Sequence, residues 1–259
     1  MLGKLLKYEY KATSRYFIGL YIVLALLTIG NKVMITIKAT TDIDLKVVDI
    51  LFGLIMVSYI VAIIAITVAT FVLILRRFYF NMLKDEGYLS FTLPTTVGQH
   101  IASKLIVGIT WFVATIVLNV ISIFVVTYSK DINYAKGISD LAQELTQSGG
   151  WGYVVEGIIS IIVTVIGMPM LMYACLSIGQ LYTKHRVVGA ILAYIGYYII
   201  NQVLSSVFLV ICMHNLGDSY DTSVFMNQML IFSIVLPIVI SIASYIVTHY
   251  ILSKKLNLE

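Results

Sequence analysis

The segment LFGLIMVSYIVAIIAITVATFVLIL, Leu51 to Leu75, contains no charged residue over its whole length. As an α-helix it would rise about 37 Å at ~1.5 Å per residue, which exceeds the ~30 Å hydrocarbon core of a bilayer. The segment therefore predicts a membrane-spanning helix.

The rest of the chain agrees with that fold class. Of its 259 residues, 60% are hydrophobic and 12% are charged, about half the charged share of an average soluble domain. We expect an all-α integral membrane protein with one transmembrane domain, residues 1–259, and six spans. The expected spans are 17–37, 51–75, 101–126, 153–181, 187–212 and 229–251. Pro169 and Pro237 lie inside the fourth and sixth spans and should kink them.

The distribution of charge predicts the orientation. If the N-terminus is cytoplasmic, the inner segments hold twelve of the 17 basic residues and the outer segments hold five. Because cytoplasmic loops are enriched in Lys and Arg, we expect both termini inside and 130–151 outside. The inner set is Lys4, Lys7, Lys11, Arg15, Arg76, Arg77, Lys84, Lys104, Lys184, Arg186, Lys254 and Lys255, and the outer set is Lys32, Lys38, Lys46, Lys130 and Lys136.

The N-terminal residues 1–16 predict an amphipathic entry helix in the cytoplasmic headgroup region. Lys4, Lys7, Lys11 and Arg15 share one helical face, with Leu2, Leu5, Leu6, Ala12 and Tyr16 opposite. An ordinary basic flank that only sets topology is the alternative. Glu9 falls in the middle of the apolar face, where we expect it to need a partner from a neighbouring helix end.

A search for catalytic chemistry is negative. The four histidines form no pair at i, i+4 spacing, and the sequence contains no P-loop motif. We therefore expect neither an enzyme nor a metal site, and no cofactor bound by this chain. Cys175 and Cys212 fall in apolar runs and are expected to be small buried side chains rather than a disulfide. Nucleic acid is not an expected partner.

The span centres are free of Asp, Glu, Lys and Arg, which disfavours a proton- or sodium-coupled carrier. Asn119 is a central polar residue that suits interhelical hydrogen bonding. In the fifth span, polar residues recur at helical spacing on one face, which should contact other helices, a partner subunit or a substrate route. That face consists of Tyr194, Tyr197, Tyr198, Asn201 and Gln202.

A specific cytoplasmic segment, RRFYFNMLKDEGYLSFTLPTT, follows the second span at Arg76–Thr96. Its first residues carry a helical apolar face that should continue the second span beyond the membrane, with Gly87 able to end the helix. Pro94 closes the next element, and Thr96 with Gln99 has the capping-box spacing that starts a helix. Apolar side chains on the cytoplasmic side predict a docking surface for a protein.

Two segments carry a family resemblance: KYEYKAT at 7–13, and RFYFN, DEGYLSFTLP and QHIASKL within 77–105. They resemble the permeases of ABC-2-type transporters, in particular those of anaerobic Gram-positive bacteria. The resemblance implies a bacterial cytoplasmic-membrane exporter of antimicrobial peptides, drugs or lipids. It also implies a second permease copy or a sister permease, and a separate ATPase subunit that binds ATP and Mg²⁺.

The resemblance further implies a coupling helix between the second and third spans that fits a groove on the ATPase. Carried over by position, the coupling residues are Asp85, Glu86, Gly87, Tyr88, Leu89, Phe91 and Pro94. The residues alone leave rival functions open: a self-contained channel or secondary carrier, and a membrane scaffold or assembly factor.

Overall fold

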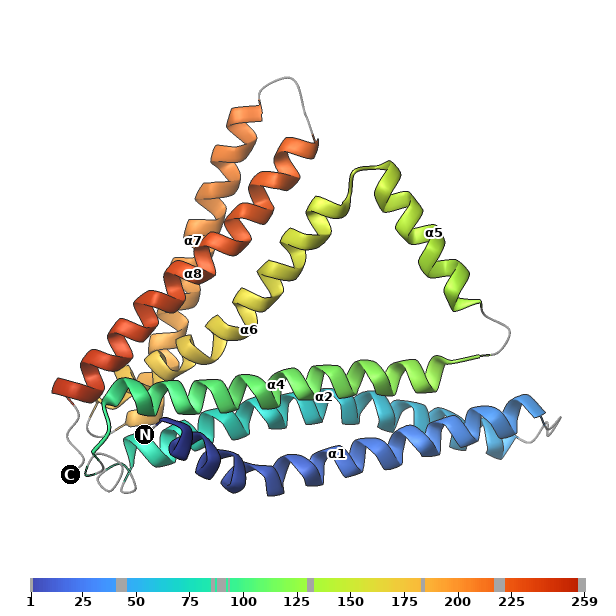
Figure 1. The fold of residues 1–259 in the computed structure, drawn as a ribbon, viewed down its shortest axis with the longest axis horizontal. Helices are drawn as coiled ribbons and strands as arrows, with labels where there is room; N and C mark the ends of the chain where they lie inside the picture. The colour runs from blue at the N-terminus through green and yellow to red at the C-terminus, as the bar shows by residue number, and fades with distance from the viewer. Residues whose placement is uncertain are drawn as a thin grey trace. The chain divides into compact units, whose positions relative to one another are not determined.

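The computed structural model describes residues 2–40, 46–84, 87, 92, 94–129, 133–182, 185–216 and 222–255. Each regular element within these ranges is an α-helix, as the apolar runs predict (Figure 1). The helices are α1 (Leu2–Thr40), α2 (Lys46–Leu83), α4 (Val97–Thr127), α5 (Tyr134–Gln147), α6 (Trp151–Gly179), α7 (Arg186–Leu216) and α8 (Thr222–Lys254).

Six of these helices, all but α5, are long and apolar enough to cross a membrane. Each contains one expected span, except that the fourth span was expected to run two residues beyond Gly179, where α6 ends. The chain is therefore a multi-pass membrane protein. Pro169 and Pro237 lie within α6 and α8, and neither proline ends its helix.

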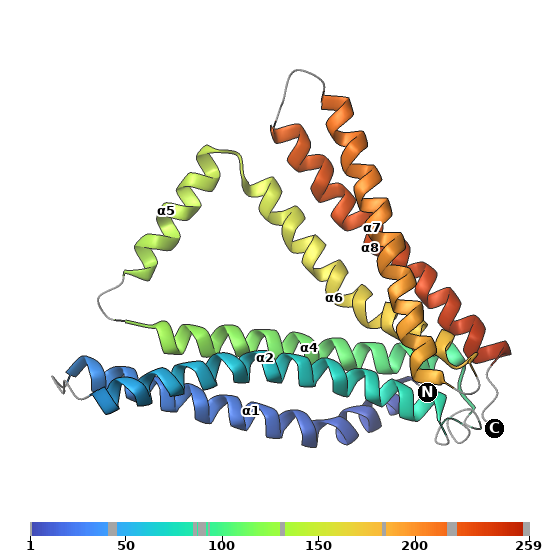
Figure 2. The same ribbon diagram turned by 180° about the vertical axis from the view of Figure 1, so that it is seen from behind.

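The contacts group the chain into two compact units, 1–76 with 102–134, and 77–101 with 135–259. In the first unit, α1, α2 and α4 lie side by side in both views (Figures 1 and 2). Hydrogen bonds pair Tyr21 with Thr115 and Thr28 with Ser122, so α1 and α4 run parallel. Apolar packing is centred on Leu24, Tyr59, Ile66 and Val126.

The second unit is built on α6, α7 and α8, which pack on one another. The Phe208 and Phe232 rings of α7 and α8 stack at 3.9 Å, and the Ser160 and Ser233 hydroxyls of α6 and α8 bond at 3.0 Å. A second bond from Ser160 replaces a backbone bond that α8 cannot make. Pro237 has no N–H to donate to the Ser233 carbonyl. The Ser160 hydroxyl donates to that carbonyl at 3.4 Å, so a neighbouring helix restores the missing bond.

Two features differ from the sequence-based expectations. No helix end separates residues 1–16 from the first span, since α1 continues from Leu2 to Thr40. The expected entry helix is thus the first four turns of a longer helix. In addition, the connection at 128–152 between the third and fourth spans was expected as a loop, but Tyr134–Gln147 within it forms the helix α5.

Candidate functional site

The expected coupling segment lies at the junction of α2 and α4. Asp85, Glu86, Tyr88, Leu89 and Phe91 lie outside the residues that the structure describes. Gly87 is buried, and its N–H donates to the Lys84 carbonyl at 2.7 Å, whereas Pro94 is exposed. The helix ends at Leu83, four residues earlier than a stop at Gly87 would place it.

The end of α2 is anchored firmly before this segment begins. Phe78 and Met82 are fully buried, and the Phe78 ring stacks on Tyr173 of α6 with centroids 3.9 Å apart and planes 8° apart. The helical extension past the membrane run is thus confirmed. Its apolar face, however, was expected to help display a docking surface for another protein. The chain's own α6 covers it instead, because two flat buried rings exclude more water together than apart.

The start of α4, on the other side of the segment, is ordered by local hydrogen bonds. The Thr96 hydroxyl accepts a long hydrogen bond from the Gln99 N–H at 3.4 Å, which confirms Thr96 as the residue that begins the helix. The Thr95 hydroxyl lies 2.7 Å from Nε2 of the buried His100. The segment therefore connects the end of α2, which packs on α6, to the start of α4, which is ordered by local hydrogen bonds.

The basic N-terminal face is present in α1. Lys4, Lys7, Lys11 and Arg15 are all exposed. The opposite side differs from the prediction in its detail. Leu2, Leu5 and Leu6 are half-buried, Ala12 and Tyr16 are exposed, and the buried positions are Thr13 and Phe17.

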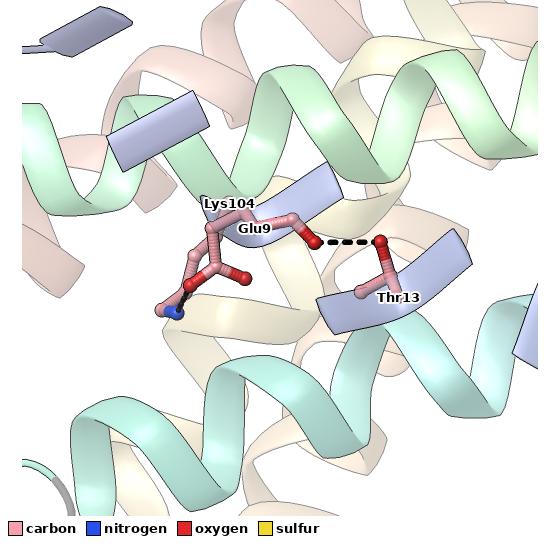
Figure 3. A network of polar contacts seen from close by, with 3 residues as sticks. All are labelled: Glu9, Thr13 and Lys104. Carbon is pink, nitrogen blue, oxygen red and sulfur yellow. Dashed lines mark hydrogen bonds and ion pairs between the residues drawn. The ribbon is translucent and has the colours of Figure 1, made fainter. Parts of the chain in front are cut away.

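Glu9 has the partner that its position requires. Its Oε1 lies 2.7 Å from Nζ of Lys104, near the start of α4 (Figure 3). Only 13% of the Glu9 side chain and 4% of the Lys104 side chain are exposed. Thr13 adds a bond from its hydroxyl to the Glu9 carbonyl at 2.8 Å. The expectation of a partner from a neighbouring helix end is confirmed, and the pair ties the two segments that carry the family resemblance.

This ion pair begins a seam of polar contacts along the α1, α2 and α4 unit. Trp111 donates its indole N–H to Thr13 at 2.9 Å, and Thr115 bonds both Tyr21 and Thr70 at 3.0 Å.

Further along the seam, Ser122 lies 2.6 Å from the hydroxyls of Tyr59 and Thr28. Asn119 donates to Thr67 at 3.0 Å, which confirms its expected interhelical role. Such bonds are the usual means by which membrane helices hold one another.

The seam could have been found in part from the sequence. Its members on α4 are Lys104, Trp111, Thr115, Asn119 and Ser122, which recur at intervals of seven, four, four and three residues. That spacing places them on one helical face. Sequence reasoning identified Asn119 alone, because single hydroxyl residues in an apolar run are too common to indicate a contact.

The semi-polar face of α7 is divided by the structure. Tyr194 and Tyr197 line a cavity of about 160 Å³ between α6, α7 and α8. Asn201 is half-buried, while Tyr198 and Gln202 are exposed. The five residues therefore share a face in sequence but do not form one site. Other lining residues come from α6 and α8, and are Thr164, Gly167, Met168, Leu171, Pro237, Ile240 and Ser241.

The size of this cavity limits what it can do. Ligand pockets for drug-sized molecules are ~300–1,000 Å³, so this one is below that range. Gly167 defines one wall, since a Cβ there would lie 2.5 Å from the Ser241 hydroxyl. A larger substrate would need α6 and α8 to separate at this contact.

A wider, more polar cavity of about 490 Å³ lies at the other ends of α6 and α8. Glu156 and Gln228 are among its lining residues. One side-chain oxygen of each is buried without a hydrogen-bond partner among the residues that the structure describes. Unpaired buried oxygens are costly, so these two mark a place where the packing is incomplete.

Comparison with protein-family models, with curated proteins and with solved structures finds no match for this chain.

Proposed function

We propose that the chain is the membrane subunit of an ATP-driven exporter of the ABC-2 type. A second permease copy or a sister permease would complete the route, and a separate ATPase subunit would bind ATP and Mg²⁺. The bacterial cytoplasmic membrane would be its location, with both termini inside. Substrates would be antimicrobial peptides, drugs or lipids.

The observation that carries the proposal is the way the segment between α2 and α4 is held. A cytoplasmic segment can transmit force only if its ends are fixed to the helices that must move. Phe78, packed on Tyr173, fixes one end, and the bonds of Thr95 to the buried His100 and of Gln99 to Thr96 order the other. The same segment carries the sequence resemblance to ABC-2 permeases.

Two further features support the proposal. The pairing of Glu9 with Lys104 joins the N-terminal segment to the helix that follows the coupling segment, so a displacement there would be passed to α1. The described spans carry no ionised residue at their centres, so an energy source outside the chain suits the protein better than an internal ion path.

The test is a pair of substitutions in the coupling segment. Tyr88→Ala with Phe91→Ala removes the aromatic anchors proposed to fill a groove on the ATPase, and Asp85→Ala removes only a charge at its rim. Buried aromatic anchors commonly cost about 2 kcal/mol or more on truncation, and rim charges much less. The double variant should insert normally but lose ATPase binding or transport-coupled hydrolysis, while Asp85→Ala retains most of both. Full binding and coupling in the double variant would refute the assignment.

A further inference from the structure

The helix α5, between the third and fourth spans, has an unusually clear division of polarity. Tyr134, Ile138, Leu141, Ala142 and Leu145 recur at i, i+4, i+7, i+8 and i+11, so they share one face, which we call the apolar face of α5. The opposite side of the helix carries charged and amide side chains. These are Lys136, Asp140, Gln143, Glu144 and Gln147.

The apolar face of α5 has no cover among the residues that the structure describes. Ile138 is 71% exposed and Leu141 is 61% exposed, and no residue of the helix is buried. Exposing the neighbouring side chains of Ile138 and Leu141 to water to this extent would be energetically unfavourable. The separation of apolar and polar side chains onto opposite faces of α5 is typical of an amphipathic helix. It indicates that another surface covers the apolar face.

The first end of α5 is fastened to the end of a membrane span. The Tyr134 hydroxyl donates to the Thr127 carbonyl at 2.9 Å and accepts from the Ser129 N–H at 3.1 Å. Thr127 is the last residue of α4. The rings of Phe124, Tyr128 and Tyr134 pack on one another, with centroids 5.6–5.9 Å apart. Clustered aromatic rings at the end of a span are typical of the membrane–water interface.

The other end of α5 is fixed to the next span by a tight turn. Gly149 takes a left-handed φ of 67°, and the Gly150 N–H bonds the Leu145 carbonyl at 2.9 Å, which closes the helix in a Schellman motif. The Trp151 indole N–H, from the first residue of α6, donates to Thr146 at 3.0 Å. The turn sends α5 away from the axis of α6 in both views (Figures 1 and 2).

These constraints keep α5 close to the ends of the two spans that flank it in the chain. Six residues separate it from α4 and three from α6, so it cannot move far from the headgroup region. We propose that α5 lies in the plane of the membrane interface and inserts its apolar face among the lipids of the leaflet that it borders. The occupant of the exposed face is thus a lipid surface, and the inference does not depend on the proposed transport function.

The test uses the full chain, with both cysteines replaced by serine, in lipid nanodiscs. Single nitroxide labels are placed at Ile138 and Leu141 on the apolar face, and at Ser139 and Gln143 as matched positions on the polar side. Molecular oxygen, which concentrates in lipid, and a water-soluble nickel chelate then compete to relax each label. We expect the oxygen-to-nickel accessibility ratio to be several-fold higher at Ile138 and Leu141 than at Ser139 and Gln143.

Two other outcomes would overturn the inference. High nickel accessibility at all four positions would place α5 in water. Low accessibility to both reagents at Ile138 and Leu141 would mean that a protein surface, not lipid, covers the face. A label-free measurement guards against distortion by the nitroxide. Relative to the unsubstituted protein, amide hydrogen exchange in α5 should speed up several-fold in Ile138→Gln with Leu141→Gln and stay unchanged in Ser139→Gln. Equal exchange rates in the unsubstituted protein and both variants would also refute the inference.

Discussion

The ion pair between Glu9 and Lys104 offers a sharp test because the same unit contains a matched exposed pair. Lys38 and Asp49 also approach to 2.7 Å, but their side chains are 46% and 57% exposed, against 4% for Lys104 and 13% for Glu9. The two pairs therefore share a distance and differ in burial. We therefore expect solvent screening and desolvation to dominate any difference between their contributions to stability.

The expected magnitudes follow from that difference. At 2.7 Å the gross attraction of two unit charges is about 6 kcal/mol with an effective dielectric constant of ~20, before desolvation is subtracted. Loss of one member of a buried pair typically costs about 3–5 kcal/mol, because the other charge remains buried. Glu9→Gln should therefore lower the free energy of unfolding by about 3 kcal/mol. Asp49→Asn should lower it by less than about 1 kcal/mol, since exposed pairs are worth little.

Removing both buried charges should cost much less than removing one. In Glu9→Gln with Lys104→Met both charges of the pair are removed together, so we expect a loss of about 1 kcal/mol or less. The double-mutant cycle would then give a coupling energy of about 2 kcal/mol or more. Trp111 is the natural reporter of unfolding, because its ring stacks on Phe17 at 4.6 Å within the same unit.

The assay is denaturant unfolding in detergent, followed by tryptophan fluorescence in a Trp151→Phe background that leaves Trp111 as the single tryptophan. Equal losses for Glu9→Gln and Asp49→Asn would refute the argument from burial. If Glu9→Gln with Lys104→Met lost as much stability as the two single variants Glu9→Gln and Lys104→Met added together, Glu9 and Lys104 would not be coupled.

Two further outcomes are expected. Single cysteines at Lys136 and Lys184, in a cysteine-free background, should react with an impermeant reagent from outside at Lys136 only, because basic residues favour the cytoplasm; labelling at Lys184 alone would invert the topology. Gly167→Ala should destabilise the second unit by about 1–3 kcal/mol, since its Cβ would lie 2.5 Å from a side-chain oxygen of α8. The matched control Gly157→Ala should be neutral or stabilising, because a Cβ at Gly157 meets nothing within 4 Å. Both glycine variants can be followed by thermal unfolding with a dye that reacts with the two buried cysteines, and a Gly167→Ala protein as stable as Gly157→Ala would contradict the tight contact.

The spans could be predicted because a membrane makes a local demand on the sequence. Every side chain of Leu51–Leu75 must suit lipid or other apolar helices, and this requirement can be evaluated without knowing the neighbours. The helix start at Thr96 was predictable for the same reason, since its bond to Gln99 spans only three residues. The two cysteines, expected to be small buried side chains, are indeed free and buried.

For contacts between distant segments, the sequence could predict that a residue needs a partner but not which residue supplies it. The sequence shows that Glu9, on an apolar face, requires a partner, but Lys104 is 95 residues away and is selected by the parallel packing of α1 and α4. Likewise, the apolar face around Phe78 is evident in the sequence. That Tyr173 covers it depends on the packing of α6 against the end of α2, which no local pattern encodes.

The helix α5 was missed for a different reason. Its apolar face spans only three turns, and the connection between the third and fourth spans as a whole is polar enough to be taken for a loop. The periodicity of Ile138, Leu141 and Leu145 was available, but a short amphipathic helix becomes stable only against a surface. The sequence does not state what that surface is.

We propose that an ATPase subunit drives this membrane protein. The most direct measurement is native mass spectrometry of the tagged chain, purified in mild detergent from the membranes of its own cells, with ATP hydrolysis measured on the same sample. We predict a complex that contains a P-loop ATPase in equal number with the membrane chains, whose hydrolysis is lost when the P-loop lysine of that partner is replaced. A chain that is isolated without an ATPase, and that still moves solute across reconstituted vesicles lacking ATP, would contradict the account.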